Sequence, residues 1–216
     1  MKRFFSVFFI FFIITNLHSQ KKSKKLSIDS LTQNKTKSIG IITSYLDNND
    51  ELFLELSDSI FKKEILVVTR FVQLPSNYSG YINAGSKTSE QVVMFEKKGE
   101  KIYLRQKSFS NIANQIDPIN ISVTKNNLTP ILASFKILNK EKIRFLIDVS
   151  SFFLKDSPGF NIIRKTERDK YKIGRADKNR SSIDSANSYP QNLEIKHTLT
   201  FEASKPPRGN NSKTLS

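Results

Sequence analysis

The sequence contains no cysteine and only two histidines, His18 and His197, among its 216 residues. The absence of cysteine excludes disulfide bonds, thiolate metal sites and a lipid anchor attached to an N-terminal cysteine. With two histidines at most, a His-rich zinc site is also excluded, and the spacing of carboxylates around His197 does not indicate a mixed site. A fold of this chain must therefore be stabilised by its hydrophobic core alone.

Acidic residues are also scarce, because 35 Lys and Arg stand against 20 Asp and Glu and give a formal net charge of +15. A strongly basic surface attracts nucleic acid, anionic lipid headgroups or acidic polymers. However, the basic residues are scattered, and their densest run, Lys21–Lys25, lies in a polar stretch typical of a solvated tail. Because no nucleic-acid-binding motif accompanies the charge, we do not expect a nucleic-acid partner.

The chain has no long apolar run. Lys2 and Arg3 precede the mostly apolar run Phe4–Ile14 of 11 residues, well short of the roughly 20 that span a bilayer. A charged start, a short apolar run and small residues are the features of a secretory signal peptide. We therefore expect a signal peptide over residues 1–19, cleaved between Ser19 and Gln20, export to the periplasm or cell exterior, and no stable membrane anchor.

The remaining residues divide into three expected parts: a polar, basic linker over 20–38, a small N-terminal β segment over 39–75 and a β-rich domain over 76–216. Short runs of Ile, Val, Phe, Tyr and Leu, separated by Asn, Asp, Gly, Lys and Pro, are typical of strands. The sequence predicts a mainly β fold, with antiparallel hairpins that form a sandwich-like or strongly bent sheet and one or two short helices.

Alternation of apolar and polar residues predicts the individual elements. The expected short helical segments lie at 58–64 and 152–154, and a buried strand is expected at 65–72. Residues 155–190 show no readable periodicity. Three hairpins are expected, pairing 41–46 with 52–56, 91–96 with 102–109, and 131–138 with 143–149.

Near the end of the chain, Leu193–Phe201 has the cleanest period-two pattern and predicts one strand with a single buried face. Thr214–Ser216 is typical of the opening of a further strand. We therefore expect a β domain that is incomplete at the C-terminus.

No sequence motif of this chain indicates a catalytic or metal-binding site. Asp47–Glu51 resembles the start of a calcium loop, but Leu52 stands where that loop needs Gly, so a hairpin turn is favoured. Gly85–Thr88 lacks the spacing of a phosphate-binding loop. His197, on the apolar face of its strand, is expected to be a buried, hydrogen-bonded histidine. We predict no catalytic and no metal-ligating residue.

Two segments, Gly80–Glu96 and Leu193–Phe201, resemble the N-terminal, non-catalytic β-rich half of a family of large secreted bacterial zinc-dependent metalloproteases. The likeness runs from Ile41 to Ser216. In that family a downstream half carries the zinc motif H-E-x-x-H-x-x-G-x-x-H, which is absent from this chain. The resemblance implies that zinc and peptide substrate belong only to a full-length form, and that this chain alone is inactive.

The resemblance also implies a partner, the missing C-terminal protease half, which in the family lies on the same polypeptide. Residues 79–90 carry the strongest likeness and are too polar for a core, so we expect Asn83 and Lys87 to contact that half. The alternative is a stand-alone secreted β-sandwich that binds an anionic surface or polymer.

Overall fold

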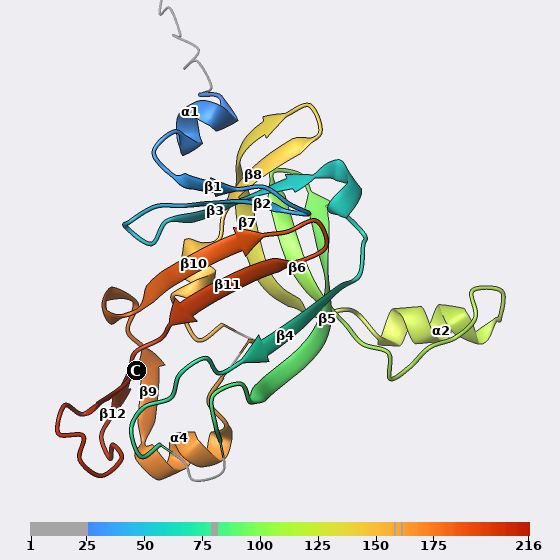
Figure 1. Cartoon of the computed structure of the whole chain (residues 1–216). Coiled ribbons are helices and arrows are strands. Elements are labelled where there is room, and N and C mark those ends of the chain that lie inside the picture. Colours follow the sequence, from blue (N-terminus) through green and yellow to red (C-terminus); the bar gives the residue numbers. More distant parts are fainter. Residues whose placement is uncertain (1–25, 79–81, 158, 161) are drawn as a thin grey trace, which may run out of the picture.

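The computed structural model describes residues 26–78, 82–157, 159–160 and 162–216. Ser19 and Gln20, at the expected cleavage site, lie outside them. The predicted mainly β, antiparallel architecture is confirmed (Figure 1). An eight-stranded antiparallel sheet forms the body, with the strand order β1 (Thr36–Ser38), β2 (Thr43–Leu46), β3 (Leu52–Ser57), β8 (Arg144–Asp148), β7 (Ile131–Glu141), β6 (Lys101–Lys107), β5 (Lys87–Lys98) and β4 (Ile65–Arg70).

Two smaller sheets accompany the large one. The hairpin of β10 (Ser182–Ser188) and β11 (Leu193–Thr198) lies across one face of the large sheet (Figure 1). A three-stranded sheet joins β13 (Thr214–Leu215), β12 (Phe201–Ala203) and β9 (Ile173–Ala176). Four short α-helices and two 3-10 turns complete the described part, at α1 (Ile28–Thr32), α2 (Ile119–Asn126), α3 (Ser150–Phe153), α4 (Lys165–Tyr171), η1 (Asp58–Ile60) and η2 (Lys178–Arg180). None of the described helices is long and apolar enough to cross a bilayer.

All three predicted hairpins are confirmed: β2 pairs with β3, β5 with β6 and β7 with β8, each antiparallel. Gly99, in the turn between β5 and β6, has a φ of 58°, a conformation that glycine adopts without a Cβ clash. The two predicted helical segments shrink to a 3-10 turn at η1 and a single turn at α3.

The main core lies between the large sheet and the β10–β11 hairpin. Inward-facing side chains of the central strands are nearly fully buried, as for Leu56, Ile102 and Ile147, each 0% exposed. The hairpin contributes the buried Ile183 and Ala186 to the same cluster. A second apolar cluster joins the three-stranded sheet to Tyr78 and Ile82. The β10–β11 hairpin therefore acts as the second layer of a sandwich.

Residues 20–38, expected to be a polar linker, are not a loose arm where the structure describes them. Residues 26–38 form α1 and β1, and Ile28 is 0% exposed, packed with Tyr45 and Leu146. Ser27 caps the helix by accepting a hydrogen bond from Ser30 N at 3.0 Å. The expectation failed because one well-placed isoleucine and a cap are enough to dock a single helical turn.

The single strand expected over Leu193–Phe201 is divided in two. β11 ends at Thr198, and the chain enters another sheet as β12 at Phe201. The partner of β11 is β10, which comes from the stretch that sequence patterns left open. Leu199, Thr200 and Phe201 are all buried at the crossing, so the sequence still alternates apolar and polar residues there although the burial no longer alternates.

Candidate functional site

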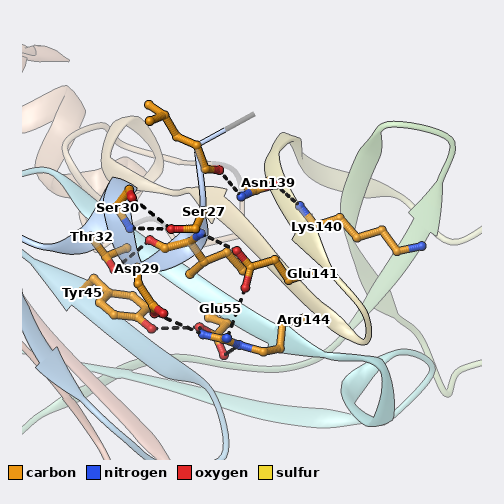
Figure 2. A network of polar contacts seen from close by, with 12 residues as sticks. Ser27, Asp29, Ser30, Thr32, Tyr45, Glu55, Asn139, Lys140, Glu141 and Arg144 are labelled. Atoms are coloured by element: carbon orange, nitrogen blue, oxygen red, sulfur yellow. Dashed lines mark hydrogen bonds and ion pairs between the residues drawn. The ribbon is translucent and has the colours of Figure 1, made fainter. Parts of the chain in front are cut away.

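A network of polar side chains on the large sheet joins its strands to the N-terminal helix (Figure 2). Arg144 on β8 donates to both carboxylate oxygens of Glu55 on β3, through Nε and Nη2 at 2.8 Å each. The Tyr45 hydroxyl on β2 donates to Glu55 Oε2 at 2.8 Å. Glu55 thus ties three adjacent strands, through a bidentate ion pair with Arg144 and a charge-assisted hydrogen bond from Tyr45.

The same network holds the start of the described chain. Glu141 accepts a hydrogen bond from the backbone N–H of Ile28 at 2.6 Å and another from Arg144 at 3.3 Å. Asn139 Nδ2 donates to the carbonyl of Leu26 at 2.5 Å. These contacts join β3, β7 and β8 to the residues at the start of α1, so the network acts as a structural clamp on that helix.

Burial and pairing shift the pKa values in this clamp. Burial raises the pKa of Tyr45 to about 12, with the neighbouring Glu55 adding to it. Burial opposes the ionised form of Glu55, but hydrogen bonds from Arg144 and Tyr45 outweigh it and lower the pKa of Glu55. Glu55 is therefore ionised and committed to Arg144 near neutral pH, which is not the state of a general acid.

A cavity of about 1050 Å³ opens between β4 and β11. Its lining follows both strands along their length and reaches apolar side chains from the core and from the segment after α3, among them Phe135, Phe152 and Phe160. It combines apolar walls with polar side chains such as Arg70 and Lys196, and such hollows are the usual ligand sites of proteins.

His197 lies on β11 at the wall of this cavity. Its Nδ1 donates to the carbonyl oxygen of Phe153 at 2.6 Å, and burial lowers its pKa. The ring lies on the inward face of its strand and is hydrogen-bonded, as predicted from the sequence, but it is half-buried instead of buried. It packs edge-on against the Phe153 ring. His197 is thus a neutral, hydrogen-bonded wall residue.

The polar loop before β5 lies near one end of the cavity, which Ala84 lines. Asn83 and Lys87 are both exposed. The loop is held by backbone bonds, with Gly85 N donating to the Phe71 carbonyl at 2.7 Å and Ser86 N to the Asn83 carbonyl at 3.0 Å. The Lys87 ammonium pairs with Glu90. The structure therefore presents these two predicted contact residues on the surface, next to a turn that is held by backbone hydrogen bonds.

Residues 108–130, between β6 and β7, form a segment that the sequence patterns did not predict and that we call the apolar excursion. It carries α2 and projects away from the body (Figure 1), and no residue of α2 is buried. Its large apolar side chains are exposed to an unusual degree, with Ile116 at 85% and Leu128 at 83%. Arg105 ties its base by donating to the Thr129 carbonyl at 2.8 Å. The signal in the sequence was a set of isoleucines without strand periodicity.

The acidic turn after β2 is a hairpin turn. Asp47 Oδ1 accepts from the backbone N–H of Asn49 at 2.8 Å and of Glu51 at 3.0 Å, while Lys35 pairs with Asp47 and Glu51 at 2.6 and 2.8 Å. These carboxylates are thus directed at protein donors. Across the described residues, no group of three or more His, Asp or Glu side chains is arranged to hold a metal ion.

The fold and the cavity define a mainly β protein built as one open-sided sandwich. Residues 85–216, more than half of the chain, match the family described as Domain of unknown function (DUF5117), and the chain belongs to this family. Residues 25–74 match a second family, described as Domain of unknown function (DUF5118). No curated protein and no solved structure is significantly similar to the chain.

Proposed function

We propose that this chain is the N-terminal, non-catalytic scaffold of an exported zinc metalloprotease, and that it docks a catalytic half through the apolar excursion and the Asn83–Lys87 loop. The catalytic half would hold the zinc and hydrolyse peptide bonds with a zinc-bound water. The residues described here do not fit a zinc site, so no catalytic step is assigned to them.

The observation that carries the proposal is the exposed apolar surface of the excursion. Ile112, Ile116, Ile119, Ile121 and Leu128 are each more than 60% exposed. Isolated apolar side chains on a surface need no explanation, but several on one projecting segment are typical of an interaction surface. A docked second domain would cover these side chains. A self-sufficient module that binds anionic polymers would do so through basic side chains, and such binding does not explain an exposed apolar surface.

The basic charge supports the alternative, a stand-alone module for anionic surfaces, less directly. Several basic side chains are engaged in ion pairs, including Lys35, Arg105, Arg144 and Arg168. Binding of a polyanion would depend on the remaining scattered lysines and would be strongly salt-dependent.

The test begins with the coding sequence downstream of Ser216. If it encodes the zinc motif in frame, the long form should bind zinc and cleave peptides, and the 216-residue chain should do neither. In the long form, the double variant Ile116→Ser/Leu128→Ser should lower activity at least tenfold, and Asn83→Ala/Lys87→Ala should impair maturation or activity.

A matched control separates docking from folding. In the 216-residue chain, Ile116→Ser/Leu128→Ser should change the free energy of unfolding by less than about 0.5 kcal/mol, because both side chains are already exposed. The proposal is wrong if no zinc motif lies downstream, or if both long-form variants keep full activity and mature normally.

A further inference from the structure

Two strand edges face each other across the cavity. β4 is the last strand of the large sheet and pairs only with β5, while β11 pairs only with β10, within the described residues. Both line the cavity, and their arrows point to the same side in Figure 1. The outer edge of each strand carries a row of backbone N–H and C=O groups that another strand can pair with.

Side chains at these edges are incompletely buried. The inward-facing Ile65 and Val67 on β4, and Leu193 and Ile195 on β11, are only half-buried. On the central strands the corresponding inward side chains are nearly inaccessible, with Val93, Leu104 and Ile137 at 2, 4 and 6%. The apolar layer is therefore less well covered at β4 and β11 than on these central strands, and a further strand between the two would cover their side chains.

Charge at the rim is mainly positive. Arg70, Lys155 and Lys196 line the cavity and are exposed. The acidic residue among the lining, Glu64, is paired with Lys107. A ligand that carries acidic groups beside an apolar centre complements this distribution.

We propose that the gap between β4 and β11 binds an extended segment of a separate polypeptide, which adds as a strand between the two edges. The segment would be about six residues long, matching the roughly 20 Å of each edge strand. Its alternate side chains would be apolar and face the core, and acidic residues would flank them. Because β4 and β11 run the same way, the added strand would pair antiparallel with both.

This occupant fits the gap better than two others. An apolar small molecule would fill the hollow but leave both rows of backbone groups unpaired. A second copy pairing through its own β4 would satisfy only one edge. Strand addition gives affinity through main-chain hydrogen bonds and specificity through alternate side chains. The proposal goes beyond the scaffold function and does not depend on a catalytic half.

The test uses purified protein and a fluorescein-labelled peptide, EVTVTVE, with binding measured by fluorescence anisotropy. Two control peptides replace the central Val by Pro, which cannot donate to a strand, or both Glu by Lys. The acidic peptide should bind at least tenfold more tightly than either control. Equal binding of the Pro peptide would overturn strand addition.

Two lysine variants provide the matched control. Val67→Lys places a charge on the inward face of β4, which lines the cavity, whereas Ile143→Lys places it between β7 and β8, where Ile143 is 60% exposed and lies outside the cavity lining. The first should weaken peptide binding at least tenfold and the second less than twofold. If Val67→Lys fails to fold, hydrogen exchange in the unaltered protein tests the proposal instead. The peptide should then protect the amides of β4 and β11 from exchange. Unchanged exchange at these amides would overturn the proposal.

Other occupants would be recognised in the same experiments. Binding of dodecanoate without binding of the peptide would assign the cavity to apolar small molecules. A dimer in sedimentation experiments that is lost in Val67→Lys but kept in Ile143→Lys would assign the edge to a second copy. Either result overturns the proposal.

Discussion

The two ends of the eight-stranded sheet are finished in opposite ways. At the β1 end, the Ser44 hydroxyl donates to the Ala186 carbonyl at 2.7 Å, and the Ser188 hydroxyl donates to the Ile42 carbonyl at 2.5 Å. At the β4 end, the described residues supply no such partner, and Leu66 and Val68 are exposed on the outer face. The same hairpin layer thus covers one end of the sheet and leaves a gap at the other.

This difference shows how the chain manages its edges. Edge strands invite unwanted pairing unless they are covered, shortened or charged. β1 is only three residues long and is covered by β10, whereas β4 has six residues and carries Arg70 as its one charged side chain. An open edge of this kind beside an apolar cavity exposes the protein to unwanted strand pairing. Its presence here favours a role in binding.

The largest loss of stability is expected from a cavity in the small core beneath α1, at the β1 end of the sheet. Ile28→Ala removes a fully buried side chain packed on Tyr45 and Leu146, and should lower the free energy of unfolding by about 3 kcal/mol. Chemical denaturation would measure it. Leu26→Ala, where the side chain is 60% exposed, should change stability by less than about 0.5 kcal/mol. Equal effects of both substitutions would mean that α1 is not docked.

A smaller loss is expected where β10 approaches the β1–β2 turn. A Cβ at Gly40 would collide with the Tyr189 carbonyl oxygen and lie 2.5 Å from Tyr189 N. Gly40→Ala should therefore destabilise the protein by about 2 kcal/mol, because the backbones must separate. At Gly174 a Cβ would meet nothing closer than 3.7 Å, so Gly174→Ala is the control and should be nearly neutral. A neutral Gly40→Ala would contradict the tight covering of this end.

The smallest effect concerns acid sensitivity of the clamp. Because the pKa of Glu55 is lowered from its ordinary 4.5, its contribution is fully present above that pH and is lost as pH falls through the lower folded-state value. Glu55→Gln should be less stable than the unaltered protein by about 1 kcal/mol at pH 7. Denaturation at pH 7 and near pH 3 would show this difference shrinking, while a constant difference would exclude linkage to Glu55.

Sequence patterns predicted the elements of the sheet but not its edges. Alternating residues such as Leu52, Leu54 and Leu56 identify a strand, and Gly99 identifies its turn, because both signals are local. The strand β10 was not predicted, because a bulge at Asp184 breaks the two-residue alternation of a strand. Ile183 and Ala186, three residues apart, both point inward. In addition, its remaining residues are polar, and their contacts form only after the chain folds.

The candidate sites show the same limit. The hydrogen-bonded state of His197 could be predicted from its place on an apolar face. The cavity could not be predicted, because it depends on β4 and β11, more than 120 residues apart in the sequence, facing each other with one unpaired edge each. The clamp of Glu55 and Arg144 is equally non-local and had no motif to mark it.

The most direct measurement of the difference between the two ends is native-state hydrogen exchange, read residue by residue on the free protein and with the acidic peptide. We predict that, in the free protein, the backbone amides on the unpaired edges of β4 and β11 exchange faster than the amides of β2 and β3. The peptide should slow exchange only at β4 and β11. Uniform protection of all four strands without peptide would contradict the account, because it would mean that the gap between β4 and β11 is already closed.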